Sequence, residues 1–259
     1  MANAIFIVII LVIVYFYILF KSFSKYSEKI KLARLLRKVQ TTKIADVIGG
    51  YVEIKGKLCD SEHLLTSPVS KVPCLYYEVL LEKKVTKCTG YGKSRSCSSY
   101  WITVLQNSES SILKIQDETG SILIDMPEAT TNIKTDFKDK VSTFDPAKEE
   151  MKTYMQQLGK DISGIFKDTY RLKEAYLEPG DSIYAIGDAY EIDGELCIGK
   201  GTKDAEPFIV SDKSEQELNQ EYRTSAILYL AAFIGLISLP ALPFLWIFGH
   251  RIYYYIHDL

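Results

Sequence analysis

The sequence has few of the residues from which hydrolytic and metal-dependent active sites are built. It contains three histidines in 259 residues, and only His63 lies between the long apolar runs near the two ends. It contains no His-Glu-x-x-His motif, no Gly-x-Ser-x-Gly motif and no Cys-x-x-Cys pair. These absences exclude the usual zinc-protease, nucleophile-elbow and paired-cysteine zinc signatures. A hydrolase could use only His63 as its base, so we predict no catalytic residue, no metal ligand and no cofactor.

A complete phosphate-binding loop and an excess of positive charge are also missing. The fragment Gly92-Lys93-Ser94 would need a glycine five residues before Gly92, but Lys87 occupies that position. The net charge of the chain is −2, and residues 44–223 carry −9. A nucleotide-binding loop and a nucleic-acid partner are therefore not predicted.

Charged side chains are absent from residues 1–20, where Asn3 is the one polar residue after Met1. A helix of this length covers the hydrocarbon core of a bilayer, so we predict an N-terminal transmembrane helix over residues 1–22. A cleaved signal peptide is the alternative. It is disfavoured because no basic residue precedes the apolar run and no small-x-small cleavage site follows it.

A second apolar run begins at Thr224 and predicts a transmembrane helix over residues 224–249, followed by a short tail, 250–259. Pro240 and Pro243 interrupt this run, which membrane helices tolerate. A re-entrant hairpin that breaks at Pro240 is the alternative.

Basic residues are concentrated directly after the first apolar run. Residues 21–43 contain eight Lys and Arg against one Glu, a net charge of +7. The apolar positions Leu32, Leu35, Leu36 and Val39 predict an amphipathic helix over residues 23–43. That helix either lies on anionic lipid or forms a stalk whose charges only set topology. The predicted lipid contacts are Lys29, Lys31, Arg34, Arg37 and Lys38. By the positive-inside rule, the middle of this multi-pass integral membrane protein lies on the cytoplasmic side.

The central residues, 44–223, predict a mainly antiparallel β domain, either barrel-like or a sandwich. Strand patterns fill residues 50–125 and 170–210, and Asp193-Gly194 is a strong hairpin turn. Residues 126–168 are more polar and predict a helical insertion. The expected fold class is a membrane-anchored α+β protein with two flanking transmembrane helices.

Two polar stretches in this domain have more than one interpretation. Residues 87–99 predict a polar loop, whose Cys88 and Cys97 could pair in an oxidising compartment but should stay reduced in the cytosol. Asp117, Glu118 and Asp125 form an acidic cluster around a turn. Asx-turn chemistry in a solvated hairpin is favoured there over a metal or catalytic site.

Four segments, taken in order, resemble the GIDE domain family, also called BAM for "beside a membrane". They are SPVSKVPCLYY at 67–77, DETGSILID at 117–125, YRLKE with LEPGDSIYAIG at 170–187, and PFIVSD at 207–212. The resemblance covers residues 45–250 and implies a β-rich domain next to a membrane that binds protein or peptide partners. It contributes no catalytic residue.

Relatives in this family resemble the MULAN-type membrane E3 ubiquitin ligases, in which a RING domain follows the second span. Only 11 residues follow Phe248 here and none is cysteine, so ligase activity is not carried over. The expected function is non-catalytic scaffolding of a membrane or cytosolic protein at the lipid bilayer. The alternatives are a ligase-related protein that relies on a partner's RING domain, and an envelope-stress or lipid-sensing scaffold. The predicted partner contacts, whose alternative is a core position, are Tyr76, Tyr77, Tyr91 and Trp101.

Overall fold

The computed structural model describes residues 2–91, 94–141, 153–156, 169–201 and 206–238. The chain divides into two compact units. The first combines residues 1–39 with residues 215–259, and the second comprises residues 40–214.

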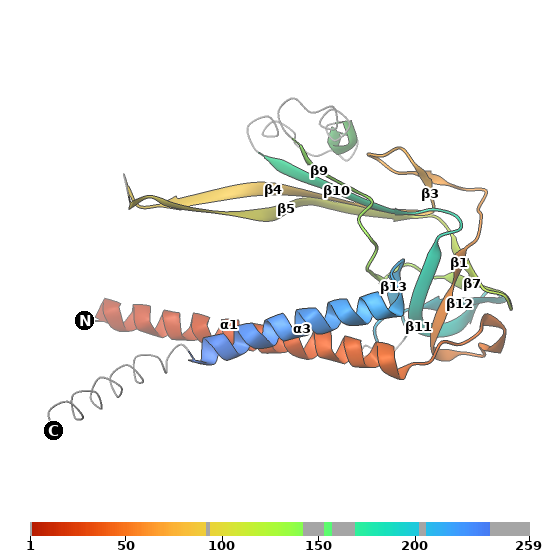
Figure 1. Cartoon of the computed structure of the whole chain (residues 1–259), viewed down its shortest axis with the longest axis horizontal. Helices are drawn as coiled ribbons and strands as arrows, with labels where there is room; N and C mark the ends of the chain where they lie inside the picture. Colours follow the sequence, from red (N-terminus) through yellow and green to blue (C-terminus); the bar gives the residue numbers. More distant parts are fainter. Residues whose placement is uncertain (1, 92–93, 142–152, 157–168, 202–205, 239–259) are drawn as a thin grey trace, which may run out of the picture. The chain divides into compact units, whose positions relative to one another are not determined.

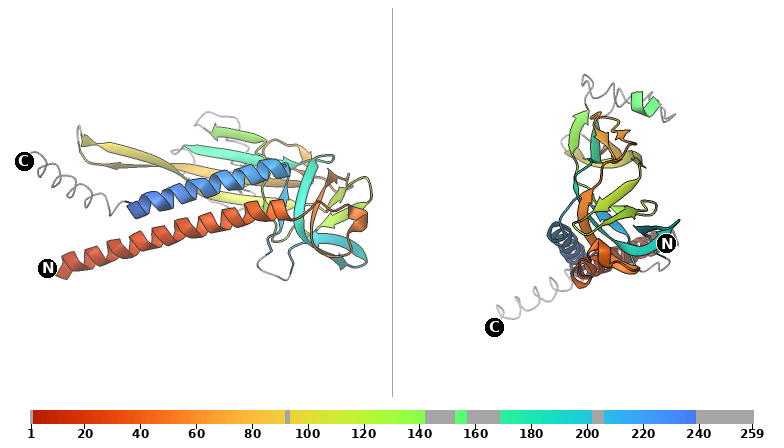
Figure 2. Two further views of the ribbon diagram at one scale, coloured as in Figure 1. Left: turned by 60° about the horizontal axis from the view of Figure 1, so that its bottom comes forward. Right: turned by 90° about the vertical axis from the view of Figure 1, so that its right-hand side faces the viewer.

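The first unit is built on two helices, α1 (Ala2–Lys38) and α3 (Glu215–Ser238). They lie side by side in Figures 1 and 2 and run in opposite directions. The Tyr15 hydroxyl, in the first half of α1, donates to the Leu236 carbonyl at 2.8 Å, near the end of α3. Close to the other ends, the Asn219 side-chain amide donates to the Ala33 carbonyl at 2.7 Å. The two helices are therefore an antiparallel pair.

One continuous helix replaces the two that were predicted for residues 1–22 and 23–43. Residues 2–38 contain neither Gly nor Pro, so nothing in the backbone breaks the helix between the apolar run and the basic run. The helix ends at Lys38, and residues 39–43 are not helical. Ala33 and Leu36 are its buried positions, and they belong to the side of α1 on which the apolar stripe was predicted.

Most of the described apolar side chains of α1 between Phe6 and Phe23 are exposed, and Tyr15 and Leu19 are half-buried. Among the described residues, one helix is long and apolar enough to cross a membrane, over Ile9–Lys38. Ile9, Leu11 and Ile13 are each more than half exposed, and Ile10 and Val12 between them are more than 40% exposed. A helix that is apolar all round is stable when lipid or protein covers it, so this helix favours membrane association. The second predicted span, 224–249, is helical as far as Ser238, and its remainder and the tail 250–259 lie outside the described residues.

The second unit contains a closed β-barrel. Its strands, in chain order, are β1 (Gly50–Leu58), β6 (Leu113–Gln116), β7 (Ser121–Ile124), β11 (Ser182–Ile192) and β12 (Glu195–Gly199). They pair in the order β1-β6-β7-β12-β11, and β11 returns to pair with β1. All pairs are antiparallel except β7–β12. This five-stranded Greek-key barrel resembles the OB-fold. Two short strands, β13 (Ile209–Ser211) and β8 (Thr130–Thr131), extend the sheet from β11.

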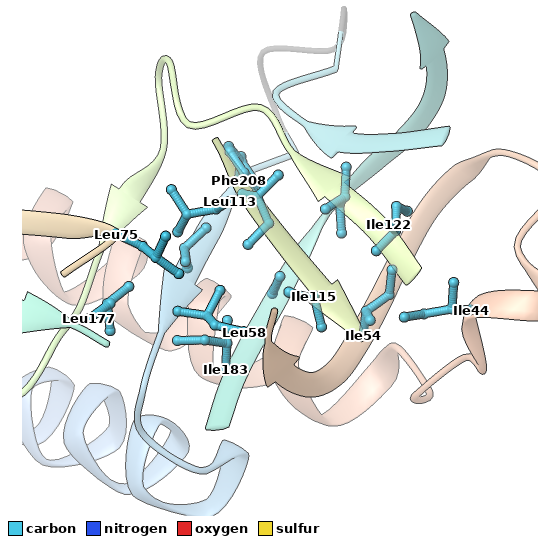
Figure 3. Packing of buried hydrophobic residues seen from close by; sticks show 14 of the residues in the cluster. Ile44, Ile54, Leu58, Leu75, Leu113, Ile115, Ile122, Leu177, Ile183 and Phe208 are labelled. Carbon is cyan, nitrogen blue, oxygen red and sulfur yellow. The ribbon is translucent and has the colours of Figure 1, made fainter. Parts of the chain in front are cut away.

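Alternating side chains of these strands fill the barrel. In β7, Ile122 and Ile124 are buried while Leu123 between them is half-buried on the other face. Figure 3 shows the packed centre, to which a short 3₁₀ helix, η1 (Ile44–Asp46), adds Ile44. The core side chains labelled there include Ile54, Leu58, Leu113, Ile115, Ile122, Ile183 and Phe208.

The two longest connections between barrel strands contain the strands of a second sheet. The β1–β6 connection supplies β4 (Tyr76–Thr89) and β5 (Ser96–Ser110). The β7–β11 connection supplies β9 (Phe137–Val141) and β10 (Tyr170–Leu177). The strand order is β5-β4-β10-β9. A small hairpin, β2 (Leu65–Thr66) with β3 (Pro73–Cys74), precedes β4. The predicted mainly antiparallel β domain is confirmed, and its form is a barrel with an attached sheet.

Two predictions for this unit are wrong in part. The helical insertion at 126–168 contains β8 and β9 in its first part, and its described helix is one turn at 153–156. These strands were not predicted because their residues are mostly polar. They form by pairing with distant strands, β13 and β10. The predicted loop at 87–99 is instead the end of the β4–β5 hairpin. Directly opposite residues Cys88 and Cys97 form a disulfide there.

Candidate functional site

A groove on the outside of the barrel is the strongest candidate site in the described part of the chain. Its volume is about 680 Å³. It is formed where the end of β5, the segment after β7 and the β11–β12 turn meet. The lining residues are Ser110, Ser111, Ile112, Leu123, Ile124, Asp125, Met126, Pro127, Ile192, Asp193, Glu195 and Cys197.

The floor of the groove follows from the register of two parallel strands. Leu123 of β7 lies opposite Cys197 of β12, and both belong to the face that points away from the barrel core. Burial raises the pKa of the Cys197 thiol, and nearby carboxylates, Asp125 first, raise it further. The thiol is therefore neutral at ordinary pH, and the floor is apolar.

The rim combines exposed apolar and acidic side chains. Ile112 is 70% exposed and Ile192 is 43% exposed, which is unusual for isoleucine at the edge of a well-packed barrel. Asp193 and Glu195 flank Gly194 in the tight β11–β12 turn. The positive φ angles of Asp193, 51°, and Gly194, 85°, are those of a type I′ hairpin. This predicted turn is confirmed, and it holds both carboxylates beside Ile192.

A tyrosine–aspartate contact braces one side of the groove. The Tyr190 hydroxyl donates to Asp125 Oδ2 at 2.6 Å. Burial and the hydrogen-bonded Asp125 raise the pKa of Tyr190, so the hydroxyl keeps its proton. A Cβ atom at residue 199 would collide with the Tyr190 hydroxyl, so Gly199 is what allows the ring to reach Asp125. Because Asp125 is engaged in this way, Asp193 and Glu195 are the carboxylates available to a ligand at the rim.

Two of the predicted partner contacts are core residues. Tyr76 is 4% exposed and packs in the barrel core. Tyr77 is 6% exposed, packs under the second sheet, and donates its hydroxyl to Glu109 at 2.5 Å. Neither ring is accessible to a partner, because each packs in a hydrophobic core. The core interpretation of these aromatics is therefore the correct one.

The other two predicted contacts lie on the long β4–β5 hairpin. Tyr91 is 97% exposed at its tip. Trp101 is partly buried, and the guanidinium carbon of Arg171 lies 4.5 Å from its ring centroid. Arg171 in turn donates to Glu82 at 2.7 Å. Trp101 therefore already has an intramolecular cation–π partner, whereas Tyr91 is free to contact another molecule.

The predicted lipid contacts lie along the C-terminal part of α1. Lys31, Arg34, Arg37 and Lys38 are exposed. Lys29 is half-buried, and its ammonium group lies 5.2 Å from the centroid of the Tyr222 ring of α3. The other four remain candidates for contact with lipid headgroups, and Lys29 also helps to hold the helix pair together.

The acidic cluster is a turn, as favoured. Asp117 Oδ1 accepts hydrogen bonds from the backbone N–H groups of Thr119 and Gly120 at 2.7 and 2.9 Å. Its Oδ2 accepts from the Ile44 N–H at 2.9 Å. Glu118 pairs with Lys43 at 2.9 Å. No group of three metal-binding side chains occurs among the residues that the structure describes.

The groove was not predicted, because its residues come from three separate parts of the sequence. Ile112 lies some 80 positions before Ile192, and each looks like an ordinary strand residue. The one local signal is the Asp193-Gly194 turn, which places a carboxylate next to an apolar strand end. Only barrel closure brings Ile112 and Ile192 to one rim.

The comparisons with known proteins agree with the motifs noted in the sequence. The family model GIDE, described as E3 Ubiquitin ligase, matches residues 82–243. No curated protein and no solved structure matches the chain. The matched range begins within β4, includes most of the barrel strands, and ends beyond the described part of α3. The chain therefore belongs to the GIDE family.

Proposed function

We propose that this protein is a membrane-anchored scaffold whose barrel binds a segment of another protein in the outer groove. The observation that carries this proposal is that exposed Ile112 and Ile192 line the same groove as the carboxylates of Asp193 and Glu195. An exposed apolar patch that is rimmed by polar residues marks an interaction site or a ligand-binding groove. The groove offers no chemistry beyond recognition, so we propose binding and not catalysis.

The chemistry of the rim defines the segment that fits best. Its apolar floor, Leu123 and Met126, accommodates a large aliphatic or aromatic side chain. The carboxylates at the β11–β12 turn favour a Lys or Arg next to that side chain, since opposite charges steer and orient a partner. We therefore propose a peptide segment with an apolar anchor and an adjacent basic residue.

Membership of a family described as E3 Ubiquitin ligase favours one role for such capture. A groove that holds a protein near a membrane would bring that protein to the ubiquitin-transfer machinery. This ligase-related role is the second candidate, and it uses the same groove.

The antiparallel helix pair supports a two-span, multi-pass anchor. Phe23 and Phe233 approach with ring centroids 5.4 Å apart, so the apolar part of α3 lies at the same level as the apolar part of α1. Ile227, Leu228 and Ile234 are more than half exposed on α3. A bilayer that covers α1 would cover these side chains too, which would otherwise each cost about 1.5–3 kcal/mol in contact with water.

We propose the cytoplasmic side for the second unit, because the basic residues after the first apolar run outnumber those before α3. The Cys88–Cys97 disulfide is unusual for that side, where structural disulfides are rare. On the cytoplasmic side, the Cys88–Cys97 pair would belong to the transient disulfides that have catalytic or redox-sensing roles.

The groove is tested by selecting binding peptides from a random phage-displayed library on the full chain in nanodiscs. We expect enrichment of peptides with a large apolar residue next to Lys or Arg. Glu195→Lys should abolish the preference for the basic residue, because it reverses the charge of the rim. Asp60→Lys is the matched control, since Asp60 is equally exposed but lies outside the groove.

The apolar requirement is tested with Ile192→Asp, for which Ile48→Asp is the control because Ile48 is 99% exposed and lies outside the groove. Ile192→Asp should lose the selected peptides, and Ile48→Asp should keep them. Absence of any enriched motif, or equal binding by Ile192→Asp and the parent protein, would exclude the groove as the binding site.

A further inference from the structure

The outer half of the β4–β5 hairpin stands apart from the second sheet. Strand β10 pairs with β4 only over residues 76–83. Beyond that point, residues 84–89 of β4 and 96–101 of β5 pair with each other. The Lys84 N–H also donates to the Thr169 carbonyl at 2.8 Å, and in the described residues no third strand joins the segment beyond it. This two-stranded segment, with Gly90, Tyr91, Ser94 and Arg95 at its turn, is here named the basic ribbon.

The ribbon is held in shape without a core of its own. An isolated two-stranded hairpin is marginally stable in water, so this one needs additional links. The Cys88–Cys97 disulfide closes its outer end, and the hydroxyls of Thr86 and Ser99 share a hydrogen bond of 2.9 Å across the strands. At its base, Trp101 packs under Arg171. The ribbon therefore presents its side chains from a stiff support.

Positive charge is concentrated on this support. The ribbon, residues 84–101, contains four Lys or Arg residues and no Asp or Glu. Lys84, Lys87 and Arg95 are exposed. The rest of the domain is strongly acidic, since residues 44–223 together carry −9. The charge of the ribbon is therefore local, and opposite to that of its surroundings.

Apolar and aromatic groups accompany these charges. Tyr91 is 97% exposed and Tyr100 is 49% exposed, and Val85 lies directly opposite Tyr100 on the same face. Lys87 follows on this face, two residues beyond Val85. Tyrosines prefer the headgroup level of a bilayer, and lysines extend to phosphate while their methylene groups contact apolar surface. Lys87 therefore shares a face with Val85 and Tyr100, and Lys84 lies on the other face, opposite Trp101.

We infer that the basic ribbon is a second attachment of this protein to membranes, binding the surface of an anionic phospholipid bilayer. A bilayer is the occupant favoured by the chain itself, because α1 carries an apolar stretch that associates it with one. The complementary charge is that of phosphatidylserine-like headgroups, which attract basic residues within about a Debye length. This inference does not rest on the groove, which lies on the barrel and carries the opposite charge.

The test uses the full chain in phosphatidylcholine nanodiscs, mixed with phosphatidylcholine vesicles that do or do not contain phosphatidylserine, and separated by flotation. The nanodiscs should float with the phosphatidylserine vesicles only, and less so at high salt. In the variant Lys84→Gln, Lys87→Gln, Arg95→Gln, partition should fall by roughly one to two orders of magnitude. Tyr91→Ser should weaken partition by a smaller factor, because only one ring is removed.

The matched control removes three lysines of the same unit that lie outside the ribbon, Lys57→Gln, Lys114→Gln and Lys138→Gln, and should float like the parent protein. The basic residues of α1 are unchanged in every variant, so a difference between variants reports on the ribbon. Equal flotation of the ribbon variant and the control would overturn the inference. Binding of poly-glutamate without any flotation would also overturn it, and would identify an acidic protein as the occupant.

Discussion

Glu174 holds the backbone of Val69 in place across 105 positions of sequence. Its Oε1 accepts a hydrogen bond from the Val69 N–H at 2.8 Å, and its Oε2 accepts one from the Ser70 N–H at 2.8 Å. The Glu174 side chain is fully buried, so water could not replace these hydrogen bonds if they were lost. Glu174 thereby ties strand β10 to the turn that precedes β3, two of the segments in which the family resemblance was recognised.

Replacing this carboxylate should destabilise the second unit. Glu174→Gln keeps one acceptor oxygen but aims an amide NH₂ at a backbone N–H, so we expect a loss of about 1–3 kcal/mol. Thermal unfolding followed by circular dichroism, and amide exchange at Val69 and Ser70, measure the effect. Glu178→Gln is the control because Glu178 is exposed. A variant that melts and exchanges like the parent protein would show that these hydrogen bonds contribute no stability.

The lowered pKa of Asp117 predicts that the protein loses stability at acidic pH. Burial opposes its ionisation, but hydrogen bonds from Ile44, Thr119 and Gly120 outweigh that effect and lower its pKa from 3.8 to about 2. A carboxyl whose pKa is lowered on folding contributes stability above its unfolded pKa, and that contribution is lost as the pH falls from about 4 to about 2. Denaturant midpoints should therefore fall more steeply across this range for the parent protein than for Asp117→Asn. Parallel curves would contradict the prediction.

The state and the sidedness of the Cys88–Cys97 pair can be measured together. In a Cys59→Ser variant, the two cysteines outside the Cys88–Cys97 pair, Cys74 and Cys197, are buried. The structure pairs Cys88 with Cys97, so an impermeant maleimide should label only after reduction. The cytoplasmic side that we propose for the second unit predicts that labelling requires lysis as well. Labelling of intact cells after an impermeant reductant would place the ribbon outside, and labelling of lysates without reductant would show free thiols.

Several features follow from residues that are neighbours in the chain. The apolar run of α1 predicts a membrane helix from length and lack of charge alone. The Asp193-Gly194 turn and the Asx turn at Asp117 depend on a few adjacent residues whose side chains and φ angles decide the backbone. The matched GIDE family also shows in short motifs along the sequence. Local chemistry is sufficient for each of these.

Other features depend on pairing between distant segments. Closure of β11 on β1 joins residues more than 120 positions apart, and it decides that Tyr76 packs inside while Ile112 stays exposed. Alternation of side chains along a strand separates its two faces, but it does not show which face another layer of the protein will cover. The core residues Tyr76 and Tyr77 were therefore predicted as partner contacts. Pairing with β13 and β10 makes strands β8 and β9 from a polar stretch. Barrel closure brings Ile112, Leu123 and Ile192 to one groove. The long apolar helix, the turns and the β character therefore follow from near neighbours in the chain, and the residues alone predict them. The groove and the outer part of the β4–β5 hairpin follow only from the fold, because strand pairing is a long-range interaction.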